Sequence, residues 1–155
     1  MKMVSNWMTL VAAAAILGAG AGCSGQRSAP PAGRLKPCPD SPNCVSSLSS
    51  DPRHRVAPIA FTGSPAEARQ RLLDVIRSLP RTAILANEGP YLHVEFTSAV
   101  FRFVDDVEFQ MDEAQTLIHV RSAARVGYWD LGANRRRVED VRRMMTKDIT
   151  EETRP

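Results

Sequence analysis

The residues best placed to do chemistry are a carboxylate inside an apolar stretch and the arginines that follow it. In the segment Phe103–Phe109, Asp105 alternates with aromatic and aliphatic residues, so a strand there would point its carboxylate towards a core. Burying a lone carboxylate costs several kcal/mol, so it needs a charged or hydrogen-bonded partner. Arg121, Arg125 and the run Arg135–Arg137 could supply one. We therefore expect a fixed ionic network in the second half of the chain.

Three interpretations of this network are open. In the first, Asp105 accepts hydrogen bonds from a later arginine and fastens the loop at 123–133 to the sheet. In the second, guanidinium groups and helix-start amides form a pocket for a carboxylate, a phosphate or a lipid head group. In the third, Asp105 and Ser122 are base and nucleophile of a hydrolase, although no histidine is placed beside them. In the pocket interpretation, the residues expected to bind the ligand are Arg121, Arg125, Asn134, Arg135 and Arg137.

Neither a metal site nor a cofactor is predicted. His93 and His119 fall on the outer face of non-adjacent strands, without further ligands, and are interpreted as surface residues rather than a metal pair. Tyr128 and Trp129 either cover an edge of the core or stack against a ligand.

The first 22 residues are predicted to be a signal peptide. Lys2 supplies a positive start, and Trp7–Leu17 is apolar but too short to span a bilayer comfortably. The small residues before Cys23 resemble a bacterial lipoprotein signal, in which the cysteine is acylated and becomes the first residue. An ordinary secretory signal is the alternative. Residues 23–34 are expected to form a flexible tether, because they are rich in Ser, Ala, Pro and Gly.

The cysteine count agrees with export. If Cys23 carries a lipid such as palmitate, Cys38 and Cys44 remain as a pair in a compartment where disulfides persist. Closing so small a ring contributes about 2.4 kcal/mol in the chain-entropy model. Free thiols are the main alternative, and a metal site is a poor one because no histidine lies near the pair.

Length and charge allow one folded domain, expected at residues 35–150 with a disordered tail at 151–155. The formal net charge is only +3, and Lys2 accounts for one of those charges. Nucleic acid is not an expected partner, because the basic residues lack any accompanying nucleic-acid motif.

Two helices are expected in this domain. Ser64, Pro65 and Glu67 predict a capped helix start, and Pro80 ends that helix. The second helix is expected from Asn134 to Ile149. Between them, alternating residues and turns predict strands at 82–87, 91–98, 101–111 and 116–122.

Hairpin geometry then predicts the strand register. It pairs Ile84 with Val94, Val94 with Val107, and Phe109 with Ile118, and it places Asp105 beside Ser122 on one apolar face. On the other face it pairs Asp106 with Arg121.

Residues 35–51 are expected to run over the surface, and residues 56–61 are expected to form a short edge strand. The expected fold is α+β, a two-layer sandwich whose four-stranded antiparallel sheet carries two helices on one face.

Three ordered blocks, Pro37–Ser47, Phe103–Phe109 and Arg121–Glu139, resemble the blocks of the domain-of-unknown-function family 1499. The resemblance implies a small exported or membrane-attached protein without an assigned activity. It supports the domain limits but supplies no active-site residues. The family often has serine where this chain has Ala124, so no catalytic role is assigned there.

We therefore expect a lipid-anchored protein of the cell envelope that faces the periplasm or the exterior. Its domain is expected to be a non-catalytic module that binds an anionic small ligand, a lipid head group or a protein partner. A hydrolase-like enzyme using Asp105 and Ser122, or a purely structural envelope protein, are the alternatives.

Overall fold

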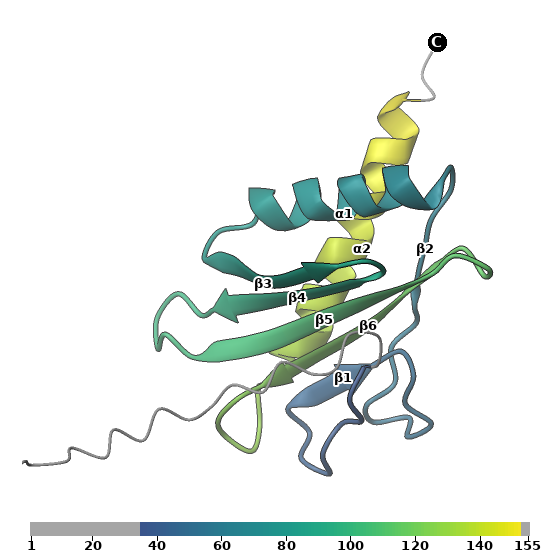
Figure 1. The fold of residues 1–155 in the computed structure, drawn as a ribbon. Helices are drawn as coiled ribbons and strands as arrows, with labels where there is room; N and C mark the ends of the chain where they lie inside the picture. Colours follow the sequence, from purple (N-terminus) through teal and green to yellow (C-terminus); the bar gives the residue numbers. More distant parts are fainter. Residues whose placement is uncertain (1–34, 153–155) are drawn as a thin grey trace, which may run out of the picture.

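The computed structural model describes residues 35–152, with side chains to residue 147 (Figure 1). The predicted signal peptide, Cys23 and the tether lie outside the described residues. Within the described part, no helix is both long and apolar enough to cross a bilayer. The elements are β1 (Cys44–Ser46), β2 (Ile59–Ala60), α1 (Pro65–Ser78), β3 (Thr82–Glu88), β4 (Tyr91–Thr97), β5 (Val104–Asp112), β6 (Leu117–Ala124) and α2 (Ala133–Glu152).

The architecture is α+β, with two helices and a sheet of six strands in the order β1-β6-β5-β4-β3, and β2 also pairs with β6. The expected count of four strands is therefore wrong. Both additional strands come from the segment before α1 and pair with the outer edge of β6, β1 at Arg121–Ala123 and β2 at Leu117–Ile118. Strand β2 lies within the short edge strand expected at residues 56–61. Strand β1 is buried, although it belongs to the segment 35–51 that was expected to run over the surface. Both strands cover an edge of β6 that would otherwise be open.

Helix α1 begins where the sequence predicts. The Ser64 side chain accepts a hydrogen bond from the Glu67 N–H (3.2 Å), and the Glu67 carboxylate accepts one from the Ser64 N–H (2.8 Å). This reciprocal capping satisfies two backbone donors that a helix start leaves unpaired. The helix ends at Ser78, two residues before Pro80, and buries Ala68, Leu72, Leu73, Val75 and Ile76.

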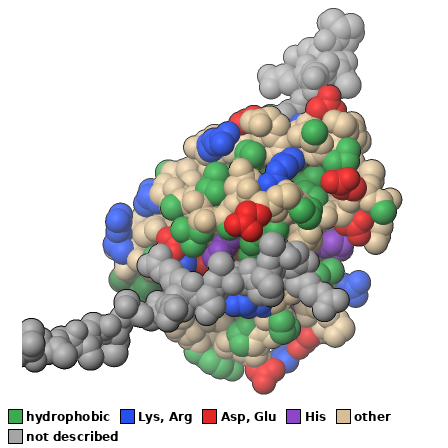
Figure 2. All heavy atoms as spheres, viewed as in Figure 1, with side chains coloured by type: hydrophobic (Ala, Val, Ile, Leu, Met, Phe, Trp, Pro, Cys, Tyr) green, Lys and Arg blue, Asp and Glu red, His purple; other side chains and the backbone are tan. Residues whose placement is uncertain are grey.

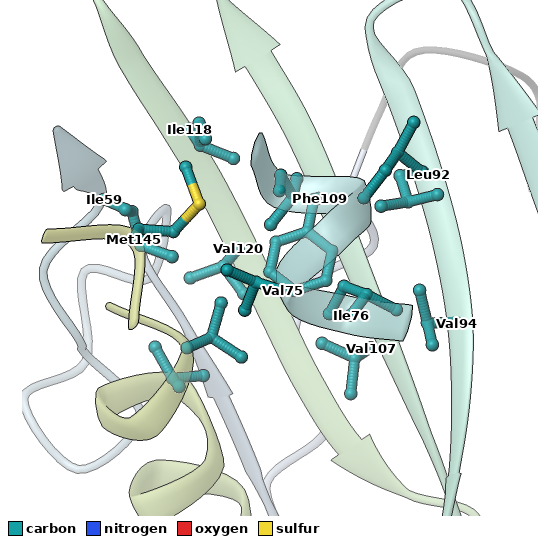
Figure 3. Packing of buried hydrophobic residues seen from close by; sticks show 14 of the residues in the cluster. Ile59, Val75, Ile76, Leu92, Val94, Val107, Phe109, Ile118, Val120 and Met145 are labelled. Atoms are coloured by element: carbon teal, nitrogen blue, oxygen red, sulfur yellow. The ribbon is translucent and has the colours of Figure 1, made fainter. Parts of the chain in front are cut away.

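The core lies between the sheet and the two helices (Figure 3). Phe109 is 1% exposed and lies among aliphatic side chains from β4, β6 and both helices. The residues of α2 that enter this core are Val138, Val141 and Met145.

The register between β4 and β5 is confirmed, with Val94 opposite Val107 and Phe96 opposite Asp105. The register between β5 and β6 differs from the prediction by two residues, because Asp112 pairs with Leu117 and residues 113–116 form the hairpin loop. Phe109 therefore lies opposite Val120 rather than Ile118, and Ser122 lies opposite Val107 rather than Asp105. A shift of two keeps every side chain on its predicted face, because alternation has a period of two.

Strand β3 also departs from the prediction in its second half. Its pairing of Ile84 with Val94 is confirmed, but a bulge follows, so Ala86 lies opposite His93, whereas an unbroken hairpin would place it opposite Leu92. The bulge moves one extra residue into this edge strand. The register shift falls at Leu85, which is 43% exposed.

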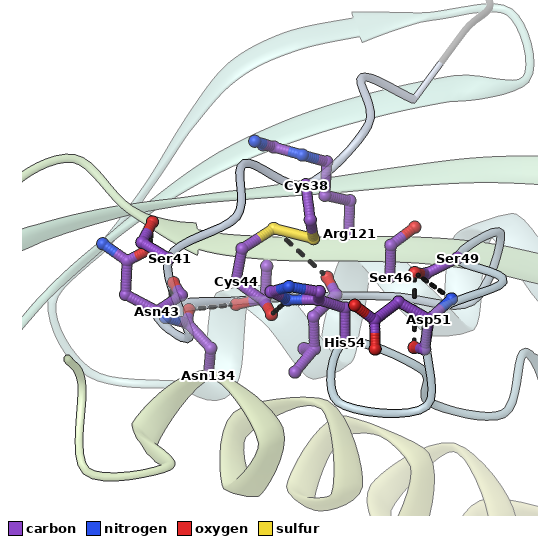
Figure 4. The surroundings of a disulfide bond; sticks show 12 residues. Cys38, Ser41, Asn43, Cys44, Ser46, Ser49, Asp51, His54, Arg121 and Asn134 are labelled. Atoms are coloured by element: carbon purple, nitrogen blue, oxygen red, sulfur yellow. Dashed lines mark hydrogen bonds between the residues drawn. A yellow bond between two sulfur atoms is a disulfide. The ribbon is translucent and has the colours of Figure 1, made fainter. Parts of the chain in front are cut away.

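The predicted disulfide between Cys38 and Cys44 is present, with an Sγ–Sγ distance of 2.05 Å (Figure 4). Cys44 is the first residue of β1, so the bridge ties the proline-rich loop to the edge of the sheet. The neighbouring Asn43 donates from Nδ2 to the carbonyl oxygen of Gly127 (2.5 Å). This bond holds the disulfide loop against the connection between β6 and α2.

Candidate functional site

Asp105 lies on the helix-covered face, 7% exposed, where it is paired with Arg137. Arg137 Nη2 donates to Asp105 Oδ2 (2.5 Å), and its Nη1 donates to Asn134 Oδ1 (2.7 Å) and Ser122 Oγ (3.2 Å). The guanidinium also lies over the Phe96 ring, 5.0 Å from the centroid. One arginine of α2 thereby connects β4, β5 and β6.

The start of α2 is fixed by a second set of hydrogen bonds around Asn134, which is fully buried. Asp130 Oδ2 accepts from the Asn134 N–H (2.8 Å), and Asp130 Oδ1 accepts from the Gly132 N–H (2.9 Å). Asn134 Nδ2 donates to the carbonyl oxygen of Asn43 (2.9 Å; Figure 4). The helix start, the sheet and the disulfide loop therefore meet at this asparagine.

This arrangement favours the structural interpretation of Asp105 over the catalytic one. Ser122 is 0% exposed, and its hydroxyl donates to Asn134 Oδ1 (2.6 Å) while it accepts from Arg137. A nucleophile needs a nearby base and room for a substrate. Here the hydroxyl proton is committed to an amide oxygen, and Asp105 is committed to a guanidinium.

The neighbouring Asp106 points to the opposite, helix-free face. Arg125 binds it in a bidentate manner, with Nε 2.8 Å from Oδ2 and Nη2 2.7 Å from Oδ1, and Arg125 also pairs with Glu95. His93 Nε2 lies 2.8 Å from Asp106 Oδ1. Burial alone would raise the pKa of Asp106, but the hydrogen bonds from Arg125 and His93 outweigh burial and hold that pKa well below its usual range. The hydrogen bond to Asp106 raises the pKa of Arg125.

Replacing Asp106 by asparagine is expected to lower the free energy of unfolding by about 1.5–3 kcal/mol at pH 7, because it removes charge-assisted hydrogen bonds. Since the folded-state pKa is below the unfolded one, the contribution of Asp106 is complete above about pH 5 and is lost as the pH falls. Urea unfolding at pH 7 and pH 3.5 should therefore show a smaller acid loss in Asp106→Asn than in the unsubstituted protein. Asp74→Asn, a change at an exposed ion pair with Arg77, is the control; an equal effect there would contradict the prediction.

Glu108 is the second buried carboxylate of the helix-free face, 2% exposed. Its Oε1 accepts from the Tyr91 hydroxyl (2.8 Å), and its Oε2 accepts from Arg121 Nη1 (2.9 Å). Burial, and then the bond to Glu108, raise the pKa of Tyr91. The predicted pairing of Arg121 with Asp106 is wrong, because the two-residue shift of β6 places Arg121 opposite Glu108.

The structure does not bring the five expected ligand-binding residues into one pocket. Arg121 and Arg125 lie on the helix-free face, whereas Asn134 and Arg137 lie between the sheet and α2. Arg135 donates to the carbonyl oxygens of Arg55 (2.7 Å) and Arg53 (2.9 Å). The separation follows from geometry: alternation along β6 turns Arg121 away from the face that α2 covers, and successive residues of α2 are turned by about 100° from one another.

The two strand histidines lie as expected on the helix-free face, in β4 and β6. His93 contacts Asp106, and His119 Nδ1 lies 3.2 Å from the Ser47 hydroxyl. Among residues 35–147, no three histidine, cysteine or acidic side chains are grouped to hold a metal ion.

A cavity of about 300 Å³ that the sequence did not predict lies at the end of the sheet where α2 begins. We call it the arginine pocket, because Arg81, Arg136 and Arg137 line it together with Phe96. Arg81 Nε donates to the carbonyl oxygen of Thr97 (3.2 Å), and Arg136 Nη1 donates to that of Leu131 (2.8 Å). Arg136 belongs to the run noted in the sequence, but Arg81 is 55 positions away, so only folding shows that they share a cavity.

A family model described as "Protein of unknown function (DUF1499)" matches residues 34–145 of the chain. The matched range covers all three sequence blocks and nearly the whole described domain. No curated protein and no solved structure matches the chain.

Proposed function

The chain belongs to the DUF1499 family of proteins of unknown function, and from that premise we propose a lipid-anchored envelope protein whose domain binds an anionic group in the arginine pocket. The binding is non-catalytic. The anion is a carboxylate or a phosphate, the groups that guanidinium donors bind best.

The observation that carries this proposal is the state of Arg81 and Arg136. Within residues 35–147, both side chains contact carbonyl oxygens and neither is paired with a carboxylate. Arg137 already has Asp105 as its partner, and Asp140, which also lines the cavity, is paired with Arg143. Two positive charges without a carboxylate partner therefore face one cavity, which favours an incoming anion.

Export and anchoring are supported by the lipoprotein-like segment before Cys23 and by the disulfide between Cys38 and Cys44. Disulfides persist in oxidising compartments such as the periplasm and the exterior. A hydrolase that uses Asp105 and Ser122 is less well supported, because the oxygen atoms of both residues are held by Arg137 and Asn134.

Titration of the full chain, purified in detergent, with inorganic phosphate tests the pocket. Arginine Nε–Hε signals followed by NMR at constant ionic strength should shift for pocket arginines. Arg81→Gln and Arg136→Gln should each weaken phosphate binding by about tenfold, because one charge-assisted hydrogen bond contributes on the order of 1.5 kcal/mol. Both side chains are exposed, so the fold should tolerate either change.

Arg77→Gln is the matched control, since Arg77 is an exposed arginine of α1 that is paired with Asp74 and does not line the arginine pocket. An unchanged phosphate affinity in both pocket variants, or an equal loss in the control, would count against the arginine pocket.

A further inference from the structure

Seven large hydrophobic side chains are exposed on two connections of the domain. The connection between β4 and β5 exposes a pair of stacked phenylalanines, whose ring centroids are 5.6 Å apart. The connection between β6 and α2 exposes a tyrosine and a tryptophan. We call these seven residues the aromatic rim: Val100 (79% exposed), Phe101 (74%), Phe103 (52%), Val126 (59%), Tyr128 (74%), Trp129 (68%) and Leu131 (64%).

The two connections emerge from the same end of the sheet. Strand β5 pairs antiparallel with both β4 and β6, so the last residues of β4 and β6 flank the first residues of β5. Where the two connections join the sheet, the Arg125 N–H donates to the carbonyl oxygen of Val104 (3.2 Å). Both connections lie at the left and lower left in Figure 1, and Figure 2 shows hydrophobic side chains along these edges. Ordinary soluble domains seldom expose so many large apolar side chains at one end.

The arginine pocket lies between these two connections, where the first leaves β4 and the second enters α2. Ser98, the first residue after β4, lines it on one side, and Ala133, the first residue of α2, lines it on the other. Exposed Arg102 also lies between the two stacked phenylalanines in the sequence. Arginines therefore accompany the aromatic rim, and the one acid within the two connections, Asp130, accepts hydrogen bonds from the Gly132 and Asn134 N–H groups.

The opposite end of the sheet has the opposite charge. The β3–β4 turn carries Glu88, and the β5–β6 turn carries Asp112 and Glu113. Neither turn, at 88–90 or 112–116, contains a lysine or an arginine. The domain is thus polarised along its strands, with aromatic residues and arginines at one end and carboxylates at the two turns of the other.

Such polarity matches the surface of an anionic bilayer. Tryptophan and tyrosine favour the boundary between head groups and acyl chains, and anionic head groups attract nearby arginines. The carboxylates at the far turns would be repelled by the same surface, which orients the domain. A protein partner would need an apolar surface shaped to two separate loops, whereas a fluid bilayer accepts loops of any shape.

The proposed lipid anchor is compatible with this orientation. The bond from Asn43 Nδ2 to the Gly127 carbonyl oxygen places the disulfide loop beside the connection that carries Trp129. Leu35, the first described residue, precedes that loop, and Cys23 precedes Leu35 by twelve positions. Twelve residues reach about 40 Å at most, so an anchored domain stays close to the membrane at a high effective concentration. A low intrinsic affinity of the aromatic rim for lipid is then enough to keep the domain docked.

We propose that the aromatic rim docks on the surface of an anionic lipid bilayer while the arginine pocket receives a lipid phosphate. This inference rests on the proposed function, because that function supplies the pocket. It adds the partner, a membrane lipid, and the orientation of the domain on the membrane.

Trp129 itself can report the docking. The chain has two tryptophans, so Trp7→Phe leaves Trp129 alone. This full chain is reconstituted into vesicles of phosphatidylcholine, or of phosphatidylcholine with phosphatidylglycerol, each containing brominated lipid that quenches nearby tryptophan. We expect Trp129 emission to shift to the blue and to be quenched at least twofold more in anionic vesicles than in neutral ones.

In the same background, the double change Val100→Ser and Phe101→Ser should abolish the quenching while leaving inorganic phosphate binding in solution unchanged. Leu48→Ser, at a leucine that is 57% exposed outside the aromatic rim, is the control and should change neither. Unquenched Trp129 in both vesicles, with phosphate still bound, would overturn docking but leave the proposed function standing. Equal quenching in both vesicles would overturn the role of the anionic lipid. Failure of the proposed function would instead appear as a loss of phosphate binding in the arginine NMR titration.

Discussion

Replacing Asp105 by asparagine is expected to lower the free energy of unfolding by about 3–5 kcal/mol, the usual cost of breaking a buried ion pair. Asp105 is 7% exposed, and Arg137 Nη2 lies 2.5 Å from its carboxylate. Without that carboxylate, the Arg137 guanidinium stays beneath α2 with only neutral acceptors, Asn134 and Ser122. Urea unfolding at pH 7 measures the effect.

A double-mutant cycle separates the ion pair from general damage to the core. Arg137→Met removes the charge and keeps an unbranched side chain over Phe96. If the pair is coupled, Asp105→Asn combined with Arg137→Met should cost clearly less than the sum of the single changes. Additive costs would show that Asp105 and Arg137 do not brace one another. Asp74→Asn, at an exposed pair, controls for the loss of one negative charge.

Replacing Glu108 by glutamine is expected to cost about 3 kcal/mol of unfolding free energy. Glu108 is 2% exposed and is the acceptor for both the Tyr91 hydroxyl and Arg121 Nη1. Glutamine keeps the shape but leaves Arg121, whose side chain is 12% exposed, without a negative partner. Tyr91→Phe removes one neutral donor only, so about 1 kcal/mol is expected there.

Glu113→Gln is the matched control for Glu108, because it makes the same chemical change at an exposed residue just beyond the same strand. We expect it to alter the free energy of unfolding by less than about 0.5 kcal/mol. A comparable loss in Glu108→Gln and Glu113→Gln would contradict the assignment of Glu108 to a buried network.

These predictions concern residues whose charges are already matched inside the domain. Asp105 and Asp106 are adjacent, yet they face opposite sides of the sheet and bind different arginines, Arg137 and Arg125. Among the arginines that line the arginine pocket, Arg81 and Arg136 are not paired with a carboxylate of the described residues. Stability and binding are therefore assigned to different arginines, so they can be tested by different variants.

Much of the local structure was predictable because it depends on short-range patterns. Alternation along β5 predicted that Asp105 faces the core, and the Ser64–Glu67 spacing predicted the start of α1. The parity of three cysteines predicted the bond between Cys38 and Cys44. The resemblance to the DUF1499 family rested likewise on three continuous blocks, and the family model matches residues 34–145.

What only the tertiary structure decided are the relations between distant segments. Alternation cannot distinguish two registers of β6 that differ by two residues, because both present the same faces. The predicted partners of Asp105 in β6 and of Arg121 in β5 were therefore wrong, although the predicted faces were right. An edge strand was expected at residues 56–61, but its partner β6 was not, and β1 is too short to leave a pattern of its own. The arginine pocket likewise exists only because the chain brings Arg81, after α1, next to Arg136 at the start of α2.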